Sequence, residues 1–433
     1  MKHGTIIAAL LWIVACTGTA FSETWTLDRT VQAALAVSSS AEIGRLDAVS
    51  SSADALSARM AWFPAVSVSA AANYVDKVME ITVPGRTIRF GDNDSYDFKL
   101  RVSQLIYDGG RLRTLRDAGL DRAEMNAHQA EASELSAEFQ AKTAFYTVAL
   151  AKETIAASDE SIREAKNHHA DVLALREQGM AVEDDVLLSR LRISQAEMSR
   201  VTCEADLERA QAAFRKVAGL APDAEVSIDW SPPLRPDPAA ADAETAFRNR
   251  PEFKALEASL RSAGKTTESA RAGHLPTLGF SGAFNYGKPG LDQPKNEWMH
   301  YFTGGVSLNW NLWDWGAVNR DVEKADIARK KTEKIIEDLK LAVARQVSEA
   351  MAGYREANRR ASLAEESAEY AKRHLELVSA SFKNGTATER DYDSAHALFT
   401  RALHDAAAAR IGKEIGRAQI EYVLGIRYRG DKP

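Results

Sequence analysis

Four short segments of the chain alternate between apolar and polar residues, as half-buried strands do. In the clearest one, Phe98 and Leu100 alternate with Asp97 and Lys99. Each segment has about the ten residues that a tilted strand needs to cross a bilayer. An antiparallel sheet with one face in water alternates in the same way, so both interpretations stay open. The predicted strands cover 65–78, 95–107, 277–287 and 301–313.

Long stretches of helix-forming sequence surround these strands. Residues 111–178 contain no proline and consist mostly of Ala, Glu, Arg, Leu, Gln and Ser. As a single helix they would be roughly 100 Å long at about 1.5 Å per residue. Their less polar positions form a stripe too narrow to fold alone, so we expect a coiled-coil sheath. We predict long helices over 111–178, 183–218, 319–383 and 388–422, and shorter ones over 26–62 and 241–273.

The whole pattern occurs twice. The stretch RMAWFPAVSVSAAANY begins at Arg59, and RAGHLPTLGFSGAFNY begins 212 residues later at Arg271. Further on, LIYDGGRLR matches NLWDWGAVNR, and Gly179 matches Gly385, at a shift of 206 residues. Such self-similarity indicates a duplicated structural unit. The chain divides into a first repeat (23–219), a proline-rich linker (220–240), a second repeat (241–426) and a tail (427–433).

The N-terminus has the features of a secretory signal peptide over residues 1–22. Lys2 precedes a short apolar run, and small residues follow it. An alternative is a lipobox, in which Cys16 would become a lipidated N-terminus. After this leader no run of about 18 apolar residues occurs, so we expect an exported protein without a helical anchor. The net charge of −6 gives no indication of a nucleic-acid partner.

The order and doubled spacing of these motifs resemble the TolC-type outer-membrane efflux proteins. The resemblance covers almost all of the mature chain and includes YDGGRLR, WDWGAVNR and FRNRPEFKALEASL. It implies a mainly α fold with β, in which three subunits each give four strands to one transmembrane β-barrel. A long α-helical coiled-coil barrel continues that β-barrel into the periplasm. The implied function is the exit duct of a tripartite efflux pump or type I secretion system.

Acidic residues follow the two glycine turns. Asp184 and Asp185 come after Gly179, and Asp391 and Asp393 come after Gly385. Acidic residues stabilise the first turn of a helix, and on the residues alone this capping role is the favoured interpretation. The alternative is a ring of carboxylates at the far end of a tube.

The resemblance gives these positions roles in a periplasmic gate. It implies that Asp391 is the first of two gate aspartates, whereas the second falls on Ser394, with Asp393 next to it. Asp185 is the matching position in the first repeat. Phe382 stands where the family can carry a tyrosine that links the gate, so that link is not expected here. The turns at Gly179, Met180, Gly385 and Thr386 are where the family meets its adaptor proteins.

Aromatic residues gather near the ends of the predicted strands, which suggests an interfacial girdle. They are Tyr107, Trp298, Tyr301, Trp313 and Trp315. The partners that the resemblance implies are two further copies of the chain, outer-membrane lipid, a periplasmic adaptor and an inner-membrane transporter of RND or ABC type.

Two other motifs carry little weight. Gly264-Lys265-Thr266 lacks the earlier glycine of a phosphate-binding loop. His168-His169 has no partner spacing for a metal, and we expect it on a solvated helix face. We expect no cofactor and no enzymatic activity, since no set of nucleophile, base and orienting group is discernible. The alternative function is a periplasmic coiled-coil scaffold without a pore.

Overall fold

The four alternating segments form one antiparallel sheet. The computed structural model describes residues 24–89, 92–231, 242–292 and 297–428. β6 ends at Asn309, four residues before the expected end, because its partner strand begins after Pro276, which has no N–H to extend the ladder. The sheet order is β1 (Ala65–Tyr74), β4 (Asp94–Tyr107), β5 (Thr277–Lys288) and β6 (Met299–Asn309).

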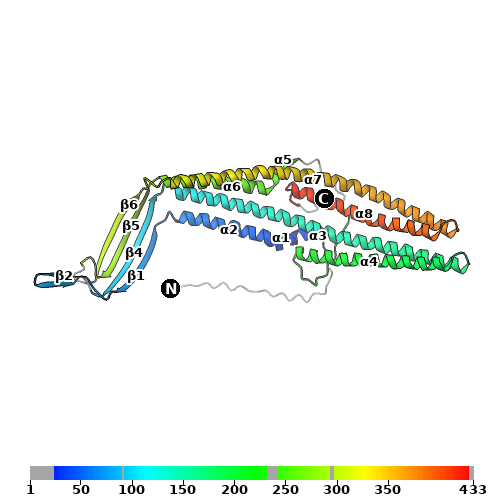
Figure 1. The fold of residues 1–433 in the computed structure, drawn as a ribbon, viewed down its shortest axis with the longest axis horizontal. Coiled ribbons are helices and arrows are strands. Elements are labelled where there is room, and N and C mark those ends of the chain that lie inside the picture. The colour runs from blue at the N-terminus through cyan, green and yellow to red at the C-terminus, as the bar shows by residue number, and fades with distance from the viewer. Residues whose placement is uncertain (1–23, 90–91, 232–241, 293–296, 429–433) are drawn as a thin grey trace, which may run out of the picture.

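A small separate hairpin lies beyond the sheet, within the segment between the first two predicted strands. It consists of β2 (Glu80–Val83) and β3 (Arg86–Arg89), joined through Gly85 at φ 85°. Figure 1 shows it at the end of the molecule opposite the long helices. β1 correspondingly ends at Tyr74 rather than at 78, since Tyr74 pairs with the first residue of β4.

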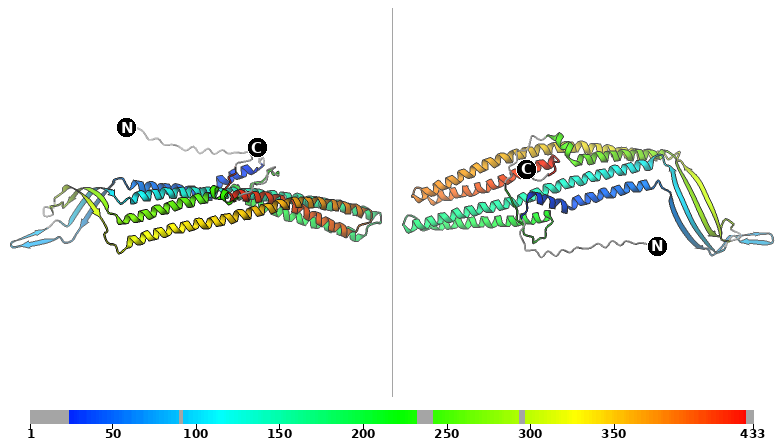
Figure 2. Two further views of the ribbon diagram at one scale, coloured as in Figure 1. Left: turned by 90° about the horizontal axis from the view of Figure 1, so that it is seen from above. Right: turned by 180° about the vertical axis from the view of Figure 1, so that it is seen from behind.

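The long helices run side by side from the sheet to two hairpin turns (Figures 1 and 2). α3 and α7 have 67 residues each, and no helix of the described chain is long and apolar enough to cross a membrane. The helices are α1 (Leu27–Val37), α2 (Ser39–Met60), α3 (Arg111–Glu177), α4 (Glu183–Ala218), α5 (Ala243–Asn249), α6 (Pro251–Arg271), α7 (Ala317–Lys383) and α8 (Glu389–Val423), with a 3₁₀ turn at Ala272–His274.

Both of the shorter predicted helices are broken in two. The segment 26–62 is interrupted at Ser38, whose N–H donates to the Ala34 carbonyl and whose hydroxyl accepts from the Ala41 N–H. The segment 241–273 is interrupted at Pro251, which begins α6, a position where its missing N–H costs nothing. A proline and a capping serine therefore override the helical pattern around them.

The same cap joins strand to helix in both repeats. The Asp108 carboxylate accepts the N–H groups of Gly110 and Leu112 at 3.0 and 2.6 Å. Asp314 accepts those of Gly316 and Val318, both at 2.9 Å. The repeated motifs around these aspartates thus encode the start of α3 and of α7.

The helices keep a fixed lateral order. Next to the sheet it is α2, α3, α6, α7, which matches the strand order. Towards the turns it becomes α4, α3, α8, α7. At the two lateral edges of the molecule, α2 with α4 on one side and α7 on the other, the described chain adds only the short helices α1, which contacts α4, and α5, which contacts α7 (Figure 2).

Part of the linker packs on the first repeat at mid-length. Between Val226 and Trp230 the linker forms a parallel bridge, which joins Ile228 to Trp25. Trp25 in turn lies edge-on against Phe214, with ring centroids 5.5 Å apart. This contact is part of an apolar core that includes residues of α3, α4 and α8.

Candidate functional site

The register of the sheet sorts its side chains onto two faces. Cross-strand partners share a face, and Val68, Leu100, Phe284 and Phe302 form one continuous row. Val68 and Phe302 are 77% and 79% exposed. So large an exposed apolar face is typical of a surface that meets lipid or another chain.

The opposite face is polar. Ser69, Lys99 and Asn285 form one row across it, and Lys99 lies 3.1 Å from Asp97. Arg101 lies on the same face and has no ion-pair partner among the described residues. Tyr301 pairs with Asn285, so it belongs to this polar face and not to an apolar girdle.

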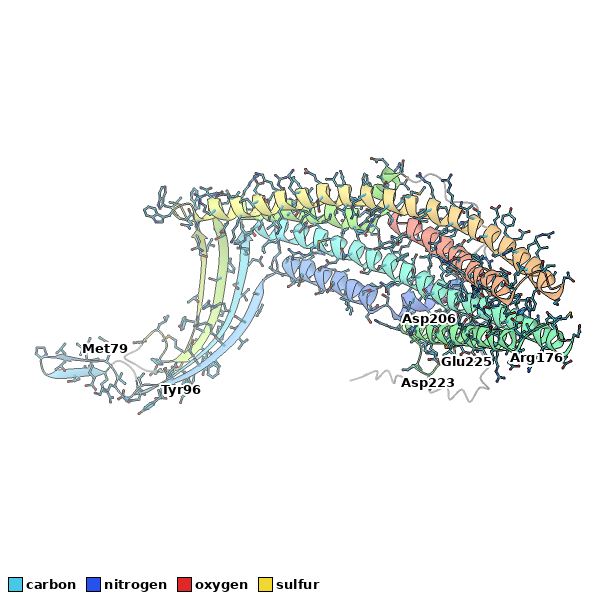
Figure 3. All side chains as sticks on the ribbon, turned by 45° about the vertical axis from the view of Figure 1, so that its right-hand side comes forward. Met79, Tyr96, Arg176, Asp206, Asp223 and Glu225 are labelled. Carbon is cyan, nitrogen blue, oxygen red and sulfur yellow. The ribbon has the colours of Figure 1, made fainter. Side chains whose placement is uncertain are left out.

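Aromatic side chains cluster near both ends of the sheet. At the end away from the helices, the Trp298 ring stacks on Tyr286 and Tyr96, with centroids 5.0 and 5.7 Å apart. At the helix end Trp313 and Trp315 are in edge contact and largely exposed. Figure 3 shows how far Tyr96 lies from the hairpin turns, where Arg176 is labelled.

Tyr107 reaches the apolar face through an irregularity in β4. Simple alternation from Val102 would put it on the polar face. A bulge between Leu105 and Tyr107 shifts the register, so that Tyr107 pairs with Leu278. Leu278 pairs in turn with Leu308 on the apolar face.

The two hairpin turns have the same backbone. Gly179 and Gly385 have φ values of 75° and 70°, which a residue with a Cβ adopts only with strain. The N–H of Met180 returns to the Leu175 carbonyl, and that of Thr386 returns to the Ser381 carbonyl, both at 2.9 Å. Met180 is 63% exposed, so its side chain is available at the tip.

Asp391 and Asp185 both cap the helix that follows the turn. Asp391 accepts the N–H and the hydroxyl of Thr388 at 2.8 and 2.7 Å, and these bonds lower its pKa. Asp185 accepts the Val182 N–H at 3.0 Å. The capping interpretation that the residues favoured therefore describes both carboxylates in this subunit.

The other two candidate aspartates differ from each other. Asp393 is held by Arg192 of α4, whose Nη2 lies 2.6 Å from its carboxylate. It therefore connects the two hairpins. Asp184 is exposed at the start of α4.

Phe382 lies in the core of the tips. It is 8% exposed and packs with Val172 and Val186, which come from the other hairpin. Its ring also meets the edge of His168 at 4.9 Å. In this subunit Phe382 thus joins the hairpins through apolar contact.

The expectation for His168 was wrong. The side chain is 2% exposed, and its Nε2 lies 2.8 Å from a carboxylate oxygen of Glu389 on α8. The ring stacks on Tyr392. A charged helix sequence gave no sign of this burial, because the partner is 221 residues away in the chain. His169 lies towards α4, with Nδ1 2.8 Å from the Ser189 hydroxyl.

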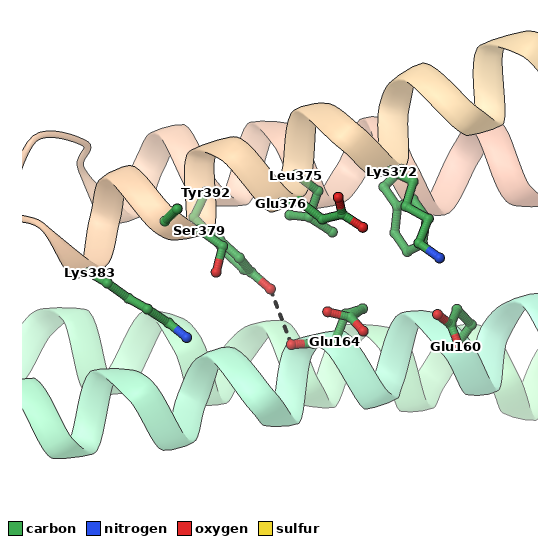
Figure 4. Close-up of a pocket in the computed structure, with 10 residues that line it drawn as sticks. Glu160, Glu164, Lys372, Leu375, Glu376, Ser379, Lys383 and Tyr392 are labelled. Carbon is green, nitrogen blue, oxygen red and sulfur yellow. Dashed lines mark hydrogen bonds between the residues drawn. The ribbon is translucent and has the colours of Figure 1, made fainter.

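A cleft of about 280 Å³ lies between the hairpins. Figure 4 shows Tyr392 at its side, donating to the Glu164 carbonyl at 3.2 Å. Both acidic and basic side chains line it, so it has no single charge preference. The lining includes Glu160, Glu164, Lys372, Glu376 and Lys383.

The predicted signal peptide and Cys16 lie outside the described residues. Within the described ranges, no group of three or more His, Cys, Asp or Glu side chains is placed to hold a metal ion. The geometry is that of an elongated subunit with a four-stranded sheet of two opposite faces at one end and helical hairpin tips at the other.

The chain belongs to the outer membrane efflux protein family. The model of that family matches residues 31–220 and 243–425. The toxin and drug export protein A of Aggregatibacter actinomycetemcomitans is 23% identical over 253 residues, which cover 56% of this chain and 54% of that protein. The matched part thus spans about half the length of that relative. As a member of this family, the chain is an outer-membrane protein that extends into the periplasm.

Solved structures share the fold over nearly the whole chain. The Campylobacter jejuni CmeC outer membrane channel superposes with a TM-score of 0.80 at 15% identity, covering 94% of this chain and 87% of that one. The Neisseria gonorrhoeae MtrE outer membrane channel, solved in its open state, gives 0.77 at 18% identity, with coverages of 93% and 89%. At these identities the likeness establishes the fold.

Proposed function

We propose that three copies of this chain form an outer-membrane channel-tunnel, the passive exit duct of a tripartite efflux pump or a type I secretion system. The observation that carries the proposal is the sheet. Its apolar face is exposed, and its edge strands β1 and β6 have no outer neighbour among the described residues. An open sheet edge cannot face lipid, so other copies must close the barrel.

Exposed apolar residues on the two free helix edges support the same assembly. On α4 they recur with heptad spacing at Leu187, Leu191, Met198 and Val201, and on α7 at Leu363, Tyr370 and Leu377. At about 1.5 Å per residue, the α4 stripe lies roughly 6–27 Å from the tip and the α7 stripe roughly 9–30 Å from it. The stripes therefore lie at one height, where α7 of one copy can pack on α4 of the next.

The tips are the proposed gate and adaptor site. Asp184, Asp185, Asp391 and Asp393 would bring carboxylates to the narrow end of the tube, and Phe382 would brace the hairpins behind them. The exposed turns at 179–180 and 385–386 would meet a periplasmic adaptor, which links the duct to an inner-membrane transporter of RND or ABC type. The name of the curated relative supports toxins or drugs as the exported class.

The test is planar-bilayer conductance combined with cross-linking across the proposed subunit contact. The double variant Leu191→Cys/Leu377→Cys, treated with a bismaleimide in detergent, should give dimers and trimers, whereas each single variant should stay monomeric on a denaturing gel. The purified protein should also conduct ions. A protein that stays monomeric and soluble without detergent would support the scaffold alternative instead.

A further inference from the structure

The interface between the two hairpins is polar where the packing within the second hairpin is apolar. Within the second hairpin, Leu375 packs with Ala395 and Phe399 in an apolar cluster. Between α3 and α8, by contrast, the facing side chains are polar over several turns. We call this line the histidine seam, after His168, His396 and His404, which all lie on it.

Each histidine of the seam bonds across it. His396 is 2% exposed, and its Nε2 lies 3.0 Å from the Ser161 carbonyl oxygen. The Ser161 hydroxyl bonds Thr400 of α8 at 2.7 Å. His404 is partly buried, with Nε2 3.4 Å from the Ser158 hydroxyl.

The His168–Glu389 pair closes the seam on the tip side. His168 Nδ1 and Glu389 Oε1 are buried without a hydrogen-bond partner among the described residues. A buried polar atom without a partner is costly, so the pair holds together chiefly through its one short contact. Phe382 packs beside this pair, so at the tip the seam is held by apolar contact as well, whereas at His396 and His404 the bonds across it are polar.

We propose that the histidine seam is a proton-sensitive joint, and that acidification loosens it and lets the α7/α8 hairpin move away from the α3/α4 hairpin. For its consequence, the opening of a duct at the tips, the inference rests on the proposed function. The movement of the hairpins can be measured independently of conduction.

The charged groups around each histidine explain why acid, rather than base, should loosen the seam. Burial lowers the pKa of both His396 and His404, partly offset for His396 by the Ser161 bond. His396 faces Arg192 of α4 and His168 of α3, while the nearby Asp393 is already paired with Arg192. No carboxylate lies within ion-pair distance of His396 among the described residues, so a proton there would be an uncompensated charge.

The other two histidines of the seam, His404 and His168, differ in their charged neighbours. His404 faces the hydroxyl of Ser158, and of the charged groups only Asp405 on its own helix favours its protonated form. His168 instead has a carboxylate partner in Glu389, and Tyr392 of α8 covers its ring. Acid should thus weaken the seam at His396 and His404, whereas the His168 Nε2 contacts the Glu389 carboxylate.

The stability that a neutral buried histidine contributes is present above its ordinary pKa and is lost as the pH falls below that value. The seam should therefore be closed near neutral pH and looser in acid. A histidine held by a carboxylate would show the opposite pH dependence, because its contact is stabilised in acid and lost as the pH rises.

The experiment measures the separation of the tips by pulsed electron paramagnetic resonance. Nitroxide labels on Gln178→Cys and Thr386→Cys report the two turns in the purified full-length protein, with buried Cys203 left in place. Between about pH 8 and about pH 5, where a histidine changes charge, the label distance should lengthen and broaden. The double variant His396→Gln/His404→Gln should remove most of this change.

His128→Gln is the matched control, because His128 lies on α3 but pairs with Glu131 outside the seam. It should leave the pH response unchanged. A label distance that is the same at both pH values in the unsubstituted protein would overturn the joint, as would a full response in the double variant. If the label distance changes with pH as expected but the protein does not conduct ions, the proposed channel is contradicted and the proton-sensitive joint is supported.

Discussion

The tips of the two repeats have the same backbone and opposite surroundings. Arg176 and Glu183 of the first hairpin pair with each other at the surface. At a shift of 206 residues, the same positions of the second hairpin are Phe382 and Glu389, and both are buried. The two repeats thus share the turn and differ in its contacts. Arg176 and Glu183 pair within their own hairpin, whereas Phe382 and Glu389 contact residues of the other hairpin.

The largest effect should come from breaking the buried pair. Glu389→Ala leaves the buried His168 Nε2 without the carboxylate that it contacts, and removal of one member of a buried pair costs about 3–5 kcal/mol. The urea midpoint of the detergent-solubilised protein should fall accordingly. Glu183→Ala at the equivalent exposed position should cost about 1 kcal/mol or less. Equal losses of unfolding free energy in the two variants would show that Glu389 contributes no more to stability than Glu183 does.

The apolar contact of the same tip should give a comparable effect. Phe382→Ala opens a cavity against Val172 and Val186, and such truncations cost about 3–5 kcal/mol. Thermal unfolding followed by circular dichroism measures this loss. Arg176→Ala removes only a surface side chain, and a similar fall in its unfolding temperature would contradict the comparison.

A smaller effect should follow at the caps. Thr388 caps α8 with its hydroxyl, whereas Val182 at the equivalent position of α4 has none to offer. Thr388→Ala should therefore destabilise the protein by about 1 kcal/mol, and Val182→Thr should stabilise it by a similar amount. Urea titrations of the two variants measure these effects, and we expect changes of opposite sign in the free energy of unfolding.

The smallest effect concerns Asp391. Its bonds to Thr388 lower its pKa, so the stability that they contribute is present above the ordinary value near about pH 4 and is lost as the pH falls below it. Asp391→Asn should flatten the acid end of the unfolding profile. In a planar bilayer it should also weaken block by divalent cations. An unchanged block would remove Asp391 from the gate while leaving its capping role.

Local signals explain why much of the fold could be predicted. Alternation marks the strands, and the glycines at 179 and 385 mark the turns, because each depends on neighbouring residues alone. The hairpin β2–β3 has a local marker too, the turn-forming Pro84-Gly85 between two short strand-prone runs, whereas the bulge that redirects Tyr107 has none. The burial of His168 depends on a partner from the other repeat, and the seam that it shares with His396 is visible only once α3 lies beside α8.

The unbroken length of α3 has a mechanical consequence. With 67 residues it is one rigid arm of roughly 100 Å, fixed to the sheet at Asp108. A tilt of one degree at that attachment displaces the far end by about 2 Å, on the scale of a hydrogen bond. Small changes where the strands meet the helices are thus amplified into side-chain-sized shifts at the opposite extremity.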